Sequence, residues 1–122
     1  ADECGSQVFI GCDLRFTKSL NAFKTFLDKL GYIHSVSIEC RSYLPGWQPD
    51  RPYTESFRAR ESEGGVLLDL IHEIDYAGWI FGWPLAVIAR LKNTGRLGIK
   101  EEDMADLFWG LYQGRSTHKQ KG

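Results

Sequence analysis

Asp69 and His72 are the two residues of this sequence whose types and spacing best suit proton transfer. An imidazole exchanges its proton near neutral pH, so a histidine can serve there as an acid or a base. The two residues are three positions apart in a stretch with helical periodicity, which places them on one face of the predicted helix. A carboxylate in that position can orient the imidazole or bind a hydroxyl. On this pattern alone, a hydrogen-bonded structural histidine is the commoner outcome.

Asp75 and Tyr76 extend the same polar region. Asp75 lies beside the face that carries His72, and Tyr76 follows His72 by one helical turn and could supply a hydroxyl. His72 and Glu73 also begin the H-E-x-x-H zinc pattern, but Tyr76 stands where the second histidine is required. The pattern therefore predicts no zinc site.

Residues 43–65 form a long polar loop that is broken by Pro45, Pro49 and Pro52. A loop of this length inside a compact domain is uncommon and is usually functional or flexible. Aromatic and charged side chains occur together in it, among them Trp47 and Arg58, and such a mixture suits a sugar-like or an anionic ligand. The alternative, which the sequence supports equally, is that the aromatic residues anchor the loop to the core.

The periodicity of the apolar residues predicts both helices and strands. Helical stripes cover residues 16–30 and 66–81, and the second helix is expected to end at Gly82. Alternating or continuously apolar residues predict three strands, over residues 7–13, 33–41 and 85–91. The third strand is almost entirely apolar and is therefore expected to be central in the sheet. Residues 100–113 fit a helix or a strand.

These elements predict an α+β fold class. The expected architecture is a mixed or mostly antiparallel sheet of three to four strands with two main helices packed on one face. The length of 122 residues fits a single domain over residues 1–114, followed by a polar tail at 115–122 that is predicted to be disordered.

The composition argues against several classes of protein. The net charge of −1 shows no basic excess for nucleic acid, which predicts no nucleic-acid partner. The sequence has neither a signal peptide nor an apolar segment of membrane-spanning length, which predicts a cytoplasmic protein with no membrane partner. The three cysteines are an odd number without a C-x-x-C pair, so we expect thiols, with Cys12 and Cys40 buried in strands.

Three stretches of the chain have the order and spacing found in one enzyme family. They are residues 11–16 (GCDLRF), residues 43–60 (YLPGWQPDRPYTESFRAR) and residues 64–76 (GGVLLDLIHEIDY), the last followed by Trp79-Ile-Phe-Gly82. Residues 98–106 match more weakly. Together they resemble one branch of the Gfo/Idh/MocA oxidoreductases, and the resemblance covers residues 7–108.

The resemblance implies a fold and a chemistry. Members of that family have an N-terminal Rossmann domain that holds NAD(P), and a C-terminal domain whose mostly antiparallel sheet serves substrate binding and oligomer contacts. They transfer a hydride between the nicotinamide and a carbon of a sugar. Carried over to this chain, the resemblance makes His72 the acid/base group and Asp69 its acidic neighbour, although many members separate these two residues by four positions rather than three. The candidate substrate-binding residues are those already named from the loop and the helix, Trp47, Arg58, Tyr76 and Asp75.

Two parts of such an enzyme have no match in these 122 residues. No G-x-G-x-x-G follows a strand, because Gly64 and Gly65 follow a polar loop and lack the third glycine. The family's Glu-Lys-Pro segment, which carries a catalytic lysine, is also not found. We therefore expect a partial C-terminal domain that holds no cofactor itself, NAD(P) being the cofactor of the parent family, and that is not catalytically active alone.

An incomplete sheet predicts an oligomer, because its open edge and apolar face need cover. We expect a homodimer or a higher homo-oligomer. Three hypotheses follow: a truncated substrate-side domain that binds a sugar-like or anionic ligand, a purely structural homo-oligomeric module, or an oxidoreductase completed by a separate nucleotide-binding chain.

Overall fold

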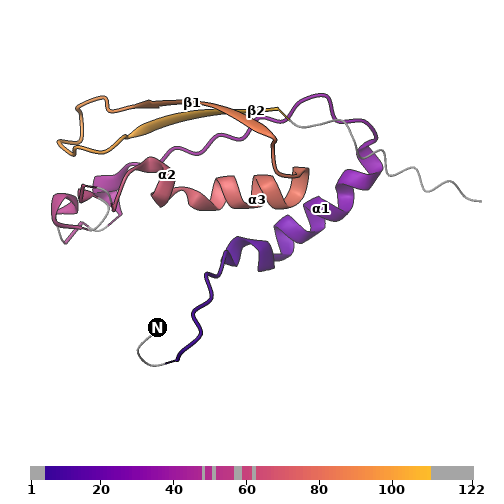
Figure 1. Cartoon of the computed structure of the whole chain (residues 1–122), viewed down its shortest axis with the longest axis horizontal. Helices are drawn as coiled ribbons and strands as arrows, with labels where there is room; N and C mark the ends of the chain where they lie inside the picture. Colours follow the sequence, from indigo (N-terminus) through magenta and orange to yellow (C-terminus); the bar gives the residue numbers. More distant parts are fainter. Residues whose placement is uncertain (1–4, 48, 51, 57–58, 62, 111–122) are drawn as a thin grey trace, which may run out of the picture. The chain divides into compact units, whose positions relative to one another are not determined.

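The computed structural model describes residues 5–47, 49–50, 52–56, 59–61 and 63–110 of the chain (Figure 1). The chain separates into two compact units, Ala1–Val36 and Ser37–Gly122. The helices are α1 (Lys18–Leu30), α2 (Val66–Asp69) and α3 (Ile71–Phe81), and the strands are β1 (Ala86–Lys92) and β2 (Met104–Gly110). Short 3₁₀ turns accompany them, among which the structure describes η1 (Asp13–Phe16), η2 (Leu44–Gly46) and η3 (Tyr53–Glu55). The described residues therefore form a small α+β structure.

In the first unit, α1 confirms the helix predicted over residues 16–30. Thr17 begins it, because its hydroxyl accepts a hydrogen bond from the backbone N–H of Leu20 at 3.4 Å. Gly31 ends it with a φ of 74°, a conformation that suits glycine. The predicted start is two residues early, because residues 13–16 form the tighter η1 turn.

The predicted strands over residues 7–13 and 33–41 do not form in the part of the chain that the structure describes. Their backbone belongs to no ladder, and the side chain of Ile10 is 94% exposed. Alternating residues indicate an apolar face, but a strand also needs a neighbouring edge with which to pair. The strand predictions for these two segments are therefore wrong.

In the second unit, the helix predicted over residues 66–81 is divided at Leu70. The backbone of Leu70 departs from helical geometry, with a φ of −107° and a ψ of 32°. The N–H of Glu73 reaches the carbonyl of Leu70 at 3.2 Å, which is the shorter i to i+3 spacing of a tight turn. The second half, α3, ends at Gly82 as predicted. The break interrupts the regular spacing that was expected to place Asp69 and His72 on one face.

Strands β1 and β2 form an antiparallel pair whose register runs from Ala86 opposite Gly110 to Lys92 opposite Met104. This confirms the third predicted strand and shows that the ambiguous segment is a strand over 104–110; residues 111–113, like the predicted tail at 115–122, lie outside the described residues. The sheet has two strands where three to four were expected, within the described residues. Because each strand of such a pair is an edge and β1 is exposed throughout, the predicted central position of β1 is wrong.

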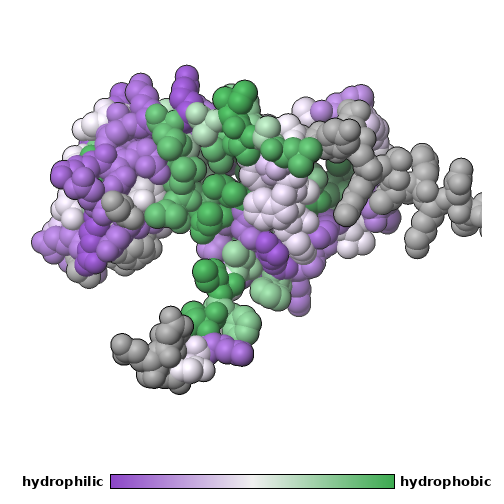
Figure 2. Space-filling view, in the orientation of Figure 1, coloured by the Kyte–Doolittle hydropathy of each residue, from purple (hydrophilic) through white to green (hydrophobic). Residues whose placement is uncertain are grey.

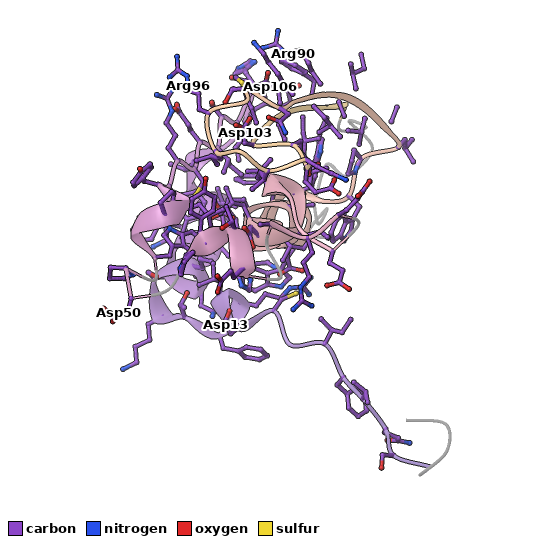
Figure 3. All side chains as sticks on the ribbon, turned by 90° about the vertical axis from the view of Figure 1, so that its left-hand side faces the viewer. Asp13, Asp50, Arg90, Arg96, Asp103 and Asp106 are labelled. Carbon is purple, nitrogen blue, oxygen red and sulfur yellow. The ribbon has the colours of Figure 1, made fainter. Side chains whose placement is uncertain are left out.

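The sheet lies along one side of α2 and α3, as the two ribbon views agree (Figures 1 and 3). One of its faces carries Trp109, whose ring is 6.0 Å from that of Trp83. The other face carries an ion pair in which the Nη2 atom of Arg90 is 2.8 Å from Oδ2 of Asp106. Figure 3 shows this pair pointing away from α2 and α3, and we call that face the outer face of the sheet.

The buried core of the described residues is small. Ala77 is its buried hydrophobic residue, and Asp75 and Ser56 are buried polar ones. Figure 2 shows hydrophobic residues grouped over the middle of the sheet and of the helices beside it. Among the described residues, no helix has the length and apolarity that crossing a membrane requires. Many large apolar side chains of the described residues are exposed to solvent.

Candidate functional site

A pocket lies between the segment around Trp47, the start of α2 and the loop that joins β1 to β2. Its cavity volume is about 60 Å³, and the wider depression around it is open to solvent. Its described lining residues are Ser42, Leu44, Trp47, Gly65, Val66, Asp69, Leu70, Leu97, Ile99, Glu102 and Asp103. Three segments that are distant in the sequence thus form one concave surface.

Trp47 forms the rim of the pocket. The η2 turn places it there, because the N–H of Trp47 donates to the carbonyl of Leu44 at 3.1 Å. Its indole Nε1–H donates to the hydroxyl of Ser42, which holds the ring in one orientation. The residue remains 42% exposed, so part of it is open to a ligand.

Asp69 forms a second wall, at the end of α2. The start of that short helix is held by Glu102, which comes from the far end of the loop between β1 and β2. The carbonyl of Glu102 accepts from the N–H of Val66 at 2.9 Å, and its Oε1 accepts from the N–H of Leu67 at 3.3 Å. These bonds satisfy two of the backbone donors that a helix leaves open at its start.

Gly65 allows this arrangement. Its φ of 96° lies in the region that favours glycine, and a Cβ there would be 2.5 Å from Oε1 of Glu102. Sequence reasoning did not identify Glu102, although Gly64 and Gly65 before a helix and the acidic run at 101–103 were both visible. No local pattern connects residues so far apart in the chain.

The loop between β1 and β2, residues 93–103, forms the third wall and is fixed by its own side chains. Asn93 donates from Nδ2 to the carbonyls of Ile99 at 2.8 Å and Glu101 at 2.7 Å. At the end of the loop, a carboxylate oxygen of Asp103 accepts from the N–H of Thr94 at 2.7 Å. Leu97 and Ile99 are thereby held against the pocket.

The carboxyl of Asp103 has a pKa below its ordinary value. Burial alone would raise this pKa, but hydrogen bonds from Thr94 and the charge of Lys92 more than offset that effect. The group is therefore charged at neutral pH, and the pocket carries negative charge at this wall.

A second group of polar side chains joins Cys40 to α3. Cys40 is largely exposed, but the partial shielding of its thiol from water, then the charge of Glu73 and a hydrogen bond to it, raise the pKa of the thiol. Burial, then the charges of Glu73 and Cys40, raise the pKa of Tyr76. Both groups are therefore protonated at neutral pH, and the hydroxyl of Tyr76 can act as a hydrogen-bond donor.

The expected burial of the cysteines in strands is wrong. Cys40 is exposed, Cys12 is only partly buried, and neither lies in a strand. The reason is the same as for the two missing strands, since both cysteines belong to those extended segments. Both residues are in the thiol form.

The structure brings together two of the six predicted site residues. Trp47 and Asp69 line the same pocket, whereas His72, Asp75 and Tyr76 are not among its described lining residues. Arg58 lies outside the residues that the structure describes. On α3, the Nδ1 atom of His72 is buried, and so is Asp75. Within the described ranges, no three His, Cys, Asp or Glu side chains gather where they could hold a metal ion.

Comparison with known proteins finds one match. The family model described as GFO/IDH/MocA C-terminal domain matches residues 27–118 of the 122-residue chain. Neither the curated proteins nor the solved structures contain a match to it. The matched range includes the pocket, α3 and both strands.

Proposed function

Since the chain belongs to the GFO/IDH/MocA C-terminal domain family, we propose that it is a substrate-side domain whose pocket binds a sugar-like, polyhydroxylated ligand. One observation carries the proposal. Trp47 and Asp69, which come from separate motifs in the sequence, line the same pocket.

The pocket has the two kinds of surface that a sugar ring requires. The C–H groups of such a ring can pack against the indole of Trp47 and the apolar side chains of Leu97 and Ile99. Its hydroxyls can donate to the carboxylate of Asp69, and hydrogen bonds to a charged acceptor are stronger than those between neutral groups. A mostly apolar pocket with a few polar groups is typical of small-molecule sites.

The charges favour a neutral ligand over an anionic one. Three acidic residues, Asp69, Glu102 and Asp103, are among those that line the pocket. An anion placed there would be repelled, the more so because the low pKa of Asp103 keeps that group charged. Of the two ligand classes expected from the sequence, the sugar-like one therefore fits better.

Redox chemistry requires more than these residues. The proposal assigns no cofactor to this chain, and NAD(P) remains the cofactor of the parent family. In an enzyme completed by a nucleotide-binding domain elsewhere, His72 would be the acid/base group and Tyr76 a neutral hydroxyl donor. The chain itself would bind the ligand and position it.

A second function is favoured by the outer face of the sheet. Ile88 and Phe108 stand opposite each other across the strands and are 74% and 65% exposed. They share that face with Arg90 and Asp106, because side chains alternate between faces along a strand. We propose that a second copy of the chain covers this face, which makes the domain a homo-oligomer as well as a ligand-binding unit.

The ligand proposal is tested by NMR titration of the ¹⁵N-labelled protein with D-glucose and with myo-inositol. The chain has four tryptophans, and Trp47→Phe identifies the indole N–H signal of Trp47. A saturable shift of that signal, weakened by the isosteric Asp69→Asn, is the expected result. The signal of Trp109, whose residue does not line the pocket, is the internal control. If neither compound shifts the Trp47 signal, the domain does not bind this class of ligand.

A further inference from the structure

We propose that Glu102 is the positioning residue of this pocket and that its charge excludes anionic ligands. The inference rests on the proposed function, since it concerns the same pocket. It adds a residue that was not among the site residues predicted from the sequence.

The positioning role follows from the path of the hydrogen bonds. Glu102 binds the N–H groups of Val66 and Leu67, and the N–H of Asp69 in turn donates to the carbonyl of Gly65 at 3.0 Å. Glu102 thus fixes the start of the four-residue α2, and a hydrogen bond within the helix joins Asp69, at its end, to that start. A helix this short is not stable alone, so its place depends on such contacts. Without them, Asp69 would lose its fixed place in the pocket.

The same residue connects two walls. Asp103 follows Glu102 directly, and its N–H donates to the carbonyl of Lys92 at 3.1 Å while its carboxylate accepts from Thr94. Lys100, in the same loop, pairs with Glu61 at 2.7 Å. Hydrogen bonds and an ion pair therefore fix the loop at several points. Through its bonds to Val66 and Leu67, Glu102 fixes the start of α2 relative to this loop.

The selectivity role follows from charge. Glu102 lines the pocket together with two other acidic residues, Asp69 and Asp103. A phosphorylated or carboxylated ligand would bring a further negative charge into a partly enclosed space, where charges interact more strongly than in water. Removal of the Glu102 charge therefore reduces the electrostatic repulsion of an anionic ligand. A neutral ligand experiences no such repulsion, so its binding does not gain from the loss of the charge.

Two substitutions separate the two roles. Glu102→Gln keeps a side-chain oxygen that can accept from Leu67 but removes the charge, whereas Glu102→Ala removes both. The probes are D-glucose and D-glucose 6-phosphate, which share a ring and differ by a phosphate. The matched control is Glu101→Gln, which makes the same charge change one residue away, at a position that does not line the pocket.

We expect Glu102→Ala to weaken glucose binding about tenfold, and Glu102→Gln to recover part of that loss. The ratio of the glucose 6-phosphate to the glucose dissociation constant should fall about tenfold in Glu102→Gln and stay within about twofold in Glu101→Gln. Amide hydrogen exchange at Leu67 should be faster in Glu102→Ala than in Glu102→Gln, because only the first variant lacks the acceptor.

The outcomes distinguish this inference from the proposed function. If neither glucose nor glucose 6-phosphate shifts the Trp47 indole signal of the wild-type protein, both the proposed function and the ligand role of Glu102 are wrong. If wild-type protein binds glucose and Glu102→Ala binds it equally well, the pocket stands and the positioning role is wrong. An unchanged ratio of the two dissociation constants in Glu102→Gln overturns the selectivity role.

Discussion

The carboxylate of Glu102 occupies the space where Gly65 would carry a side chain: a Cβ at residue 65 would lie 2.5 Å from Oε1 and 2.8 Å from the carboxyl carbon of Glu102. The backbone at Gly65 also has a φ of 96°, which other residues adopt only with strain. Position 65 thus combines two separate requirements for glycine.

The substitution Gly65→Ala should destabilise the protein by about 1–3 kcal/mol for the backbone strain and displace Glu102 in addition. The matched control is Gly95→Ala, since Gly95 has a φ of 74° but no atom within 4 Å of its Cβ position. Urea unfolding followed by circular dichroism measures both variants. Equal losses in the two would mean that the contact with Glu102 adds nothing.

The hydrogen bond from Thr94 to Asp103 should make stability depend on acidity. Because the pKa of Asp103 is lower in the folded protein than its ordinary value, the group stabilises the fold above the ordinary aspartate pKa. That contribution is lost as the pH falls through the folded-state pKa.

Thr94→Val removes the hydroxyl that donates to Asp103 and should lower the urea concentration at the unfolding midpoint at about pH 7. The difference between the midpoints of the variant and the wild type should become smaller toward about pH 2, where Asp103 becomes protonated. In an Asp103→Asn background the same substitution should have little pH dependence. A difference between wild type and Thr94→Val that is constant across the whole pH series would show that Asp103 is not the titrating group.

Substitution of the outer sheet face should change the oligomer. Phe108→Glu places a charge in the middle of the apolar pair with Ile88 and should convert the protein to a monomer, because a buried charge without a partner is costly. Light scattering after size-exclusion chromatography gives the mass. Phe26→Glu, at an exposed position on α1, is the control and should leave the mass unchanged. A wild-type monomer would contradict the proposed assembly outright.

Cys40 should react slowly with iodoacetamide at neutral pH, because its raised pKa leaves little of the reactive thiolate. Glu73→Gln removes the neighbouring charge, so the thiol pKa should fall and alkylation should be faster. Mass spectrometry of the peptides resolves Cys40 from Cys12, which serves as the reference within the same sample. An alkylation rate that Glu73→Gln leaves unchanged would show that Glu73 does not act on the thiol.

Local patterns in the sequence predicted the elements that depend on neighbours along the chain. The capped helix α1 and the glycine that ends α3 follow from local rules, and the apolar run of β1 marked a strand. The predictions failed where a distant partner decides the outcome. The segments at 7–13 and 33–41 have the alternation of strands, but the ladder partners that would make them strands are not in place among the described residues.

The candidate site divides in the same way. Trp47 and Asp69 were candidates because each belongs to a motif that can be seen in the sequence, and their part in binding a substrate stays a prediction. The break at Leu70 and the hydrogen bonds of Glu102 to the start of α2 were not predicted, because both depend on how the loop after β1 meets the start of α2. The placement of His72, Asp75 and Tyr76 near a substrate stays a prediction.

The bond between Glu102 and Leu67 spans 35 positions of the chain, and that span sets an order of events during folding and synthesis. On the ribosome, the residues of α2 emerge well before the residue that fixes the start of this helix. Because α2 is too short to persist alone, it should take its final place only after β1 and β2 have paired. The pocket would then be among the last parts of the domain to form. A chain interrupted before residue 102 would contain the motifs at 43–60 and 64–76 but would lack the pocket.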